Sequence, residues 1–292
     1  GLAFSNSPVT GRAAAATGRT ISRISSRIIA APFRFVLPNA QAALKMPPMK
    51  IASFNINGVK ARIEALTDWL AGSETDVVVL QEIKSVDEGF PREHFEDLGW
   101  TVETHGQKGF NGVAILSKLP IIDGGDNDWA QLGHARHVAA RLENGVTIHN
   151  VYVPAGGDIP DREENIKFGQ KLDYLTEMRD YFRWNKPDRA ILVGDLNIAP
   201  REDDVWSHKQ LLDVVSHTPI EVEHLKGFQS SLNWVDAVRH FVPETEKCYT
   251  WWSYRNQDWR KSNRGRRLDH IWVTPPLAPA LRSHHIHVDA RD

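Results

Sequence analysis

Short runs of valine, isoleucine and leucine, each bounded by turn residues, set the strongest limit on how this chain can fold. From Lys50 onward these runs alternate with a few amphipathic stretches that have helical spacing. Apolar runs of this length are typical of buried strands, and their mixture with helices predicts a mixed α/β domain. We expect helices near 60–71 and 163–184, and strands at 50–54, 76–80, 111–117, 136–142, 146–153, 189–194 and 269–274.

Composition excludes several other classes of protein. The chain is 41% hydrophobic and 25% charged, as in ordinary globular proteins. No apolar run approaches the roughly 18–20 residues of a membrane-spanning helix, so we expect no membrane partner. The single cysteine, Cys248, cannot form an internal disulfide, and no cysteine or histidine spacing indicates structural zinc. A reducing compartment and a monomer are therefore expected.

Residues 1–48 differ from the rest of the chain. Residues 1–50 carry seven lysines and arginines and no acid, whereas the remainder carries 28 bases and 37 acids. We expect 1–48 to lie outside the fold, as a mitochondrial-type targeting peptide or as sequence upstream of an initiator at Met49. The folded domain then spans 49–292. A cytoplasmic bacterial protein is expected, and a mitochondrial one only if 1–48 is a real targeting peptide.

Acidic and amide side chains collect where predicted strands end. Asn55 and Asn57 follow the first strand, Glu82 the second, and Asp195 and Asn197 the run at 189–194. Such residues also form turns, but oxygen ligands at several strand ends can converge on one site. Oxygen-only ligands indicate a hard cation such as Mg²⁺ or Mn²⁺.

A series of motifs carries a family resemblance. In chain order the motifs are Phe54-Asn-Ile-Asn-Gly58, Leu80-Gln-Glu-Ile-Lys84, Tyr152-Val-Pro-Ala-Gly156, Gly194-Asp-Leu-Asn-Ile-Ala-Pro200 and Arg267-Leu-Asp269. Together they resemble the exonuclease III family of abasic-site endonucleases, within the endonuclease/exonuclease/phosphatase superfamily. The resemblance implies that 49–292 is a catalytic domain of that superfamily, a four-layer α/β sandwich of two packed mixed β-sheets flanked by helices.

The resemblance also assigns roles to the residues at the strand ends. It implies that Glu82 and Asn55, with Asp195 and Asn197, hold the metal, and that Asp195 is a general base or proton shuttle. Asn197 then donates to the phosphate, and Tyr152 binds or protonates it. Asp269 is the residue that, in the family, orients a catalytic histidine.

A basic and aromatic segment predicts the nucleic-acid surface. Between Arg255 and Arg267 six bases face one acid, with tryptophans interleaved and just upstream. The residues expected to bind substrate are Asn57, Lys108, Asn111, Trp251, Arg255, Arg267 and Leu268; the resemblance implies that Trp251 and Leu268 line the pocket for a base-free sugar. It implies a Mg²⁺-dependent DNA phosphodiesterase of base excision repair, which cuts 5′ to abasic sites and removes nucleotides or blocks from the 3′ ends of duplex DNA.

One departure from the family pattern leaves alternatives open. The family's terminal Ser-Asp-His-x-Pro motif is not present before Asp292, so we expect a C-terminally truncated domain in which one strand is missing. His284, His285 and His287 are expected on a surface-facing strand rather than in the site. The alternatives are a phosphodiesterase of the same fold with another substrate, or a DNA-binding fragment without catalysis.

Overall fold

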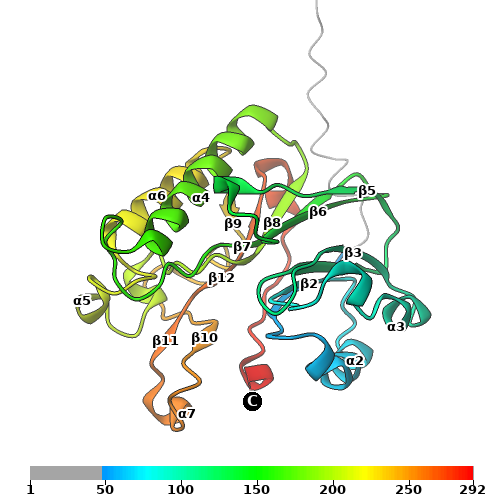
Figure 1. Ribbon diagram of the computed structural model, residues 1–292, viewed down its shortest axis with the longest axis horizontal. Helices are drawn as coiled ribbons and strands as arrows, with labels where there is room; N and C mark the ends of the chain where they lie inside the picture. The colour runs from blue at the N-terminus through cyan, green and yellow to red at the C-terminus, as the bar shows by residue number, and fades with distance from the viewer. Residues whose placement is uncertain (1–47, 292) are drawn as a thin grey trace, which may run out of the picture. The chain divides into compact units, whose positions relative to one another are not determined.

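The smaller of two stacked sheets forms the right-hand part of the computed structural model, which describes residues 48–291 (Figure 1). Its order is β1-β2-β4-β3, with β1 and β2 parallel and the other pairs antiparallel. The strands are β1 (Ile51–Asn55), β2 (Val77–Gln81), β3 (Thr101–His105) and β4 (Val113–Ser117).

The larger sheet has the order β5-β6-β7-β8-β12-β9. Only β7 and β8 are parallel among its described pairs. The strands are β5 (Ile121–Gly125), β6 (His137–Leu142), β7 (Thr147–Tyr152), β8 (Ala190–Asp195), β9 (Val235–Asp236) and β12 (Asp269–Val273).

Helices cover the outer face of each sheet, which confirms the predicted sandwich of two mixed sheets flanked by helices. Helices α2 (Ile63–Gly72) and α3 (Arg92–Asp97) pack on the smaller sheet, and α4 (Ile166–Asn185) and α6 (Pro219–Ser230) on the larger one (Figure 1). A hairpin, β10 (Trp251–Trp252) and β11 (Gly265–Arg266), projects with α7 (Trp259–Ser262) at its tip. The remaining elements are α5 (His208–Leu211) and the 3₁₀ turns η1 (Lys60–Arg62), η2 (Asp87–Gly89), η3 (Trp129–Gln131), η4 (Glu202–Asp204), η5 (Pro275–Ala280) and η6 (Val288–Arg291).

Strand β2 shows why its sequence is an unbroken apolar run. Val77 and Val79 pack between the sheets, whereas Val78 and Leu80 pack beneath α2 and α3. All four side chains are fully buried. A strand that is covered on both faces has no polar side, so period-two alternation is lost.

Two buried amides join the sheets. Asn150 of β7 accepts a 2.8 Å hydrogen bond from the Gln81 side chain of β2. The Asn150 amide nitrogen donates to the carbonyls of Leu80 (2.9 Å) and Ala114 (2.8 Å). Buried amides are costly without partners, so these bonds fix the offset of one sheet on the other.

The predicted strands and both predicted helices are confirmed to within three residues. Strands β3 and β5 were missed, because the sequences Thr-Val-Glu-Thr-His and Ile-Ile-Asp-Gly-Gly contain no long apolar run. Helix α6 was also missed, although its capping box, Thr218 with Glu221 and Pro219 between them, announces its start. The strand expected around His284–His287 was wrong, since this segment has no strand pairing.

Two other expectations bear on the ends of the chain and on membranes. The prediction for residues 1–48 falls almost entirely outside the described residues. Within the described part of the chain, no helix is long and apolar enough to cross a bilayer.

A buried histidine pair lies in the larger sheet. His137 of β6 and His149 of β7 are stacked, with Nε2 of His137 3.1 Å from Nδ1 of His149. Burial lowers the pKa of His149 to about 4, and burial together with His149 lowers the pKa of His137 well below its usual value. Both rings are therefore neutral in the folded protein at neutral pH.

We expect this pair to make the fold acid-sensitive. Unfolded histidines bind protons below about pH 6.5 whereas these two do not, so the free energy of unfolding falls as pH drops from 6.5 toward 4. His149→Gln should flatten this dependence, and the surface variant His224→Gln should not. Denaturant unfolding between pH 7.5 and 5 measures the slope; equal slopes for both variants would contradict the assignment.

Candidate active site

The predicted site residues converge where the two sheets end side by side. Asn55 and Glu82 come from the ends of β1 and β2 in the smaller sheet. In the larger sheet Tyr152 pairs with Asp195 across β7 and β8, and Asp195 pairs with Asp269 across β8 and β12. The structure thus brings together five residues that span more than 200 positions of sequence.

Glu82 is the most heavily hydrogen-bonded carboxylate of the cluster. Its Oε1 accepts from the Tyr152 hydroxyl (2.7 Å) and the Asn55 amide (2.9 Å), and its Oε2 lies 3.1 Å from Lys84 Nζ. Burial raises the pKa of Glu82, but the three donors outweigh it and hold the pKa below its ordinary value. Glu82 is therefore a fixed, ionised oxygen ligand.

Asp195 is held differently. Its Oδ1 accepts from the backbone amide of Asn197 (3.0 Å) and its Oδ2 from the Asn55 side chain (3.3 Å). Burial and the facing charge of Asp269 raise the pKa of Asp195 to about 8, and burial raises the pKa of Asp269 to about 6. Thr250 bonds Asp269 but supplies no charge. The two carboxyls that face each other across the ladder therefore both hold a proton to higher pH than an ordinary aspartate.

Strained backbone places several of these groups. Glu82 and Asn197 both have φ of 53°, a left-handed conformation that is uncommon for non-glycine residues. Gly194 precedes Asp195 with φ of 145°, and a Cβ there would lie 2.0 Å from the Val151 carbonyl oxygen. Only glycine lets β8 approach β7 closely enough to bring Asp195 beside Tyr152.

Sequence reasoning missed two cations in the site. Lys84 contacts Glu82 and also donates to the Asn57 side-chain oxygen. Arg136 lies 4.9 Å from the centre of the Tyr152 ring and donates to the Tyr152 carbonyl (3.2 Å). Lys84 stood within a quoted motif and could have been found there, whereas Arg136 comes from a segment without any such signal.

The donor set fits a hard cation. Glu82 and Asp195 offer carboxylate oxygens, Asn55 offers an amide oxygen, and the charges of Asp195 and Asp269 repel each other. Within residues 48–291 no three His, Cys, Asp or Glu residues cluster as a metal site. A cation bound by one or two carboxylates, with water and substrate in its other positions, matches this set.

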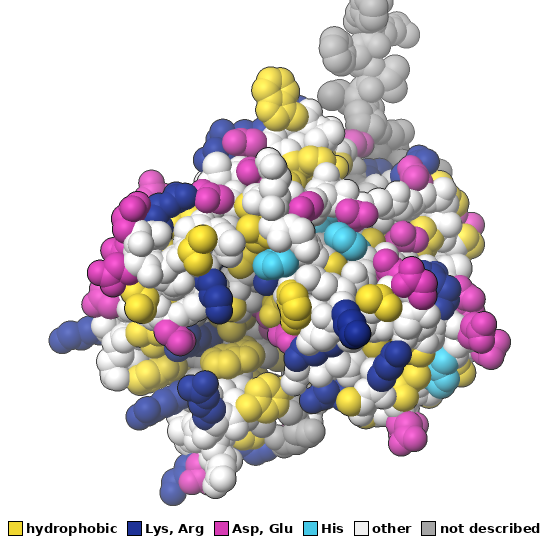
Figure 2. All heavy atoms as spheres, viewed as in Figure 1, with side chains coloured by type: hydrophobic (Ala, Val, Ile, Leu, Met, Phe, Trp, Pro, Cys, Tyr) yellow, Lys and Arg dark blue, Asp and Glu magenta, His cyan; other side chains and the backbone are white. Residues whose placement is uncertain are grey.

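The hairpin provides a positive and aromatic surface. Arg264 lies over the Trp206 ring (4.7 Å) and Arg266 over the Trp251 ring (5.7 Å). Trp251 and the buried Leu268 pack in one cluster with Trp206. Figure 2 shows lysine and arginine side chains over the hairpin and across the lower part of this face.

This geometry agrees with relationships found by comparison. Residues 52–291 match the Endonuclease/Exonuclease/phosphatase family. The chain belongs to this family. All three activities in the family's name hydrolyse a phosphate ester, which accords with a carboxylate cluster beside a basic surface.

Among similar proteins, exodeoxyribonuclease III of Haemophilus influenzae is 35% identical to this chain over 79% of the chain and 89% of the relative. An exodeoxyribonuclease of Bacillus subtilis is 29% identical over 82% and 94%. The structure of an AP endonuclease from Archaeoglobus fulgidus has a TM-score of 0.73 and 32% identity over 79% and 88%. A 3′ phosphatase from Neisseria, bound to a product DNA hairpin, has a TM-score of 0.74 and 29% identity over 80% and 90%.

Two predicted substrate contacts need correction. Arg267 is fully buried, where it donates to Asp204 (2.7 Å) and Asp236 (2.8 Å), so its guanidinium anchors the hairpin base instead of meeting DNA. Asn111 is 6% exposed and donates to the Gln107 side chain (3.0 Å) within its own loop. The basic count alone could not distinguish buried from exposed positions.

Of the remaining substrate predictions, Leu268 is buried to the same extent as Asn111, and the others reach the surface. Asn57, Lys108 and Arg255 are exposed, and Trp251 is half-buried. Of these, Asn57 contacts the carboxylate cluster through Lys84. Their binding roles stay predictions.

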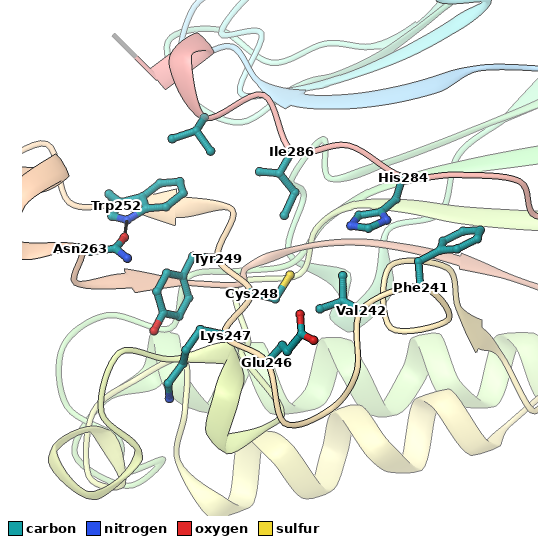
Figure 3. A pocket seen from close by; sticks show the side chains of 11 residues that line it. Phe241, Val242, Glu246, Lys247, Cys248, Tyr249, Trp252, Asn263, His284 and Ile286 are labelled. Carbon is teal, nitrogen blue, oxygen red and sulfur yellow. Dashed lines mark hydrogen bonds between the residues drawn. The ribbon is translucent and has the colours of Figure 1, made fainter.

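The cysteine lies apart from the cluster. A cavity of about 560 Å³ between the hairpin and the C-terminal segment is lined by Cys248, Trp252 and Ile286 among others, and by none of the predicted site residues (Figure 3). Burial raises the pKa of the Cys248 thiol, which makes it a poor nucleophile. Cys248 is thus a buried residue of the cavity wall, apart from the carboxylate cluster.

We expect Asp195→Asn to stabilise this protein at alkaline pH when no metal is bound. The pKa of Asp195 is about 8 in the folded protein and about 4 in the unfolded chain. The free energy of unfolding therefore falls as pH rises from about 4 to 8. In chelator at pH 8 the variant should melt at least about 2 °C higher than the wild type, with a smaller gap at pH 5. A lower melting temperature at pH 8 would contradict the charge repulsion.

Arg267 and Arg264 should behave oppositely on substitution. Arg267→Ala leaves Asp204 and Asp236 buried with fewer partners, so we expect a loss of about 3–5 kcal/mol of unfolding free energy. Arg264→Ala, at an exposed position, should change stability by less than about 0.5 kcal/mol but weaken DNA binding. Chemical denaturation measures the stability of the two variants, and a titration with duplex measures their DNA binding. Equal losses of stability would contradict a buried structural role for Arg267.

Proposed function

We propose that this protein is a Mg²⁺-dependent phosphodiesterase of DNA repair, which cuts duplex DNA on the 5′ side of abasic sites and removes nucleotides or blocks from 3′ ends. The main support is the carboxylate cluster at the end of the sandwich, with the Trp251–Arg266 hairpin beside it. Names of relatives that include exodeoxyribonuclease III and an AP endonuclease support the same substrate class.

The chain's own residues divide the chemistry. Glu82 and Asn55 would hold Mg²⁺, which supplies positive charge at the phosphate oxygens. Asp195, whose pKa lies near neutrality, accepts a proton from the attacking water. Asn197 keeps one side-chain N–H beyond its bond to Val153 as a neutral donor for a phosphate oxygen, and Tyr152 would donate to phosphate by exchanging its bond to Glu82. Burial, with the charges of Asp195 and Glu82, raises the pKa of Tyr152, so its hydroxyl keeps its proton.

The hairpin supports DNA as the substrate. Its arginines lie against tryptophan rings, which combines phosphate attraction with flat stacking surface. Trp251 and Leu268 form an apolar wall next to Asp269, suited to a sugar without its base. An abasic nucleotide leaves the helix at low cost, because it has no pairing or stacking to break.

The deciding experiment is incision of a labelled duplex with one abasic analogue. We expect cleavage with Mg²⁺ and none with chelator. We expect Asp195→Asn and Glu82→Gln each to reduce kcat by about 100-fold or more. Glu64→Gln, on the exposed side of α2, is the matched control and should retain full activity. Mn²⁺ in place of Mg²⁺ tests the choice of cation.

Substrate choice is tested in parallel. Turnover of an inositol phosphate or of intact duplex at a rate comparable with the abasic duplex would refute the repair assignment. Binding of abasic duplex by the folded wild type, without incision at any metal concentration, would refute catalysis.

A further inference from the structure

One buried lysine lies directly behind the active-site cluster. Lys171, in the second turn of α4, has no exposed surface. An ammonium group has three protons to donate, and here all three are used. Nζ donates to the Asn197 carbonyl (2.9 Å), to the Ala155 carbonyl (3.2 Å) and to Glu221 of α6.

The two carbonyls belong to the two loops that leave the site. Asn197 follows β8 and Asp195, and Ala155 follows β7 and Tyr152. A single charged group thus ties both loops to the helix beneath them. The approach is close, since a Cβ on Gly156 (φ 90°) would lie 2.9 Å from the Lys171 side chain.

Asn197 passes this restraint to Asp195. Its peptide N–H donates to Asp195 Oδ1 (3.0 Å), and its side chain donates to the Val153 carbonyl (2.9 Å). Asn197 is also in the left-handed region, which needs outside contacts to persist. The Lys171 bond to its carbonyl is such a contact.

Glu221 makes the burial of this charge tolerable. It is fully buried and accepts from Lys171, from the Ser216 amide (2.9 Å) and from the Thr218 hydroxyl (2.6 Å). A buried ion pair adds little stability over apolar residues of the same size. Stability therefore does not explain why the Lys171–Glu221 ion pair lies behind the site.

We propose that Lys171 is a positioning residue, which orients Asp195 and Asn197 by holding the loops that follow β7 and β8. Its side chain does not reach substrate; it acts through the Asn197 backbone, whose carbonyl it bonds and whose N–H donates to Asp195. This inference rests on the proposed phosphodiesterase function.

The test compares Lys171→Met/Glu221→Gln with Glu221→Gln alone. The double variant removes the carbonyl bonds without leaving a buried charge, whereas the single variant keeps the lysine and its two carbonyl bonds. We expect the double variant to lose about 10- to 100-fold in kcat relative to the single variant, with KM for abasic duplex changed by less than about twofold. Leu225→Ala, in the packing of α6, is the stability control and should lower the melting temperature but not kcat.

Amide hydrogen exchange in metal-free protein provides the second readout. The Asn197 amide should exchange faster in the double variant than in the single variant and Leu225→Ala. If the wild type is active and the double and single variants have equal kcat and equal exchange at Asn197, the positioning role is overturned. Should the wild type be inactive, the function fails, while the exchange result still decides the role of Lys171.

Discussion

The packing of the two sheets is the constraint on which the candidate site depends. Asn55 and Glu82 belong to one sheet, and Tyr152 and Asp195 to the other, yet hydrogen bonds of 2.7–3.3 Å join them. Such distances hold only if the sheets keep one offset. Apolar packing between them is not directional, so the buried amides of Gln81 and Asn150 provide the register. A slip of one sheet would leave these amides unpaired and take the site apart.

Local strain then aims the groups that packing has gathered. Glu82 and Asn197 sit in left-handed backbone at the ends of buried strands, where a regular turn would point their side chains elsewhere. Neighbours over-determine these conformations: Asn55, Tyr152 and Lys84 hold Glu82, and Lys171 bonds the Asn197 carbonyl. Strain that is anchored in this way costs stability but fixes direction.

Charge is distributed unevenly over the same small region. Glu82 has enough donors to remain ionised, whereas Asp195 faces Asp269 and takes up protons near neutral pH. On the hairpin Arg264 and Arg266 lie on tryptophan rings. An anionic phosphodiester is attracted by the hairpin and repelled by the carboxylates unless a cation lies between them. This opposition is the physical argument for the cation in the proposed function.

The sequence by itself determined the strands buried on both faces and the residues at their ends, because unbroken apolar runs followed by Asn, Asp or Glu are local signals. These signals predicted a mixed α/β domain and the convergence of Asn55, Glu82 and Asp195, whereas the sandwich and the place of Asp269 were implied by the resemblance to the exonuclease III family. Edge strands such as β5 and the role of Arg136 lacked such signals, since they depend on partners distant in the chain. Tertiary structure alone decided which arginines are buried: Arg267 and Arg264 stand three residues apart, yet one is enclosed by Asp204 and Asp236 and the other is exposed. Burial is a property of the packed chain, and residue type and spacing do not contain it.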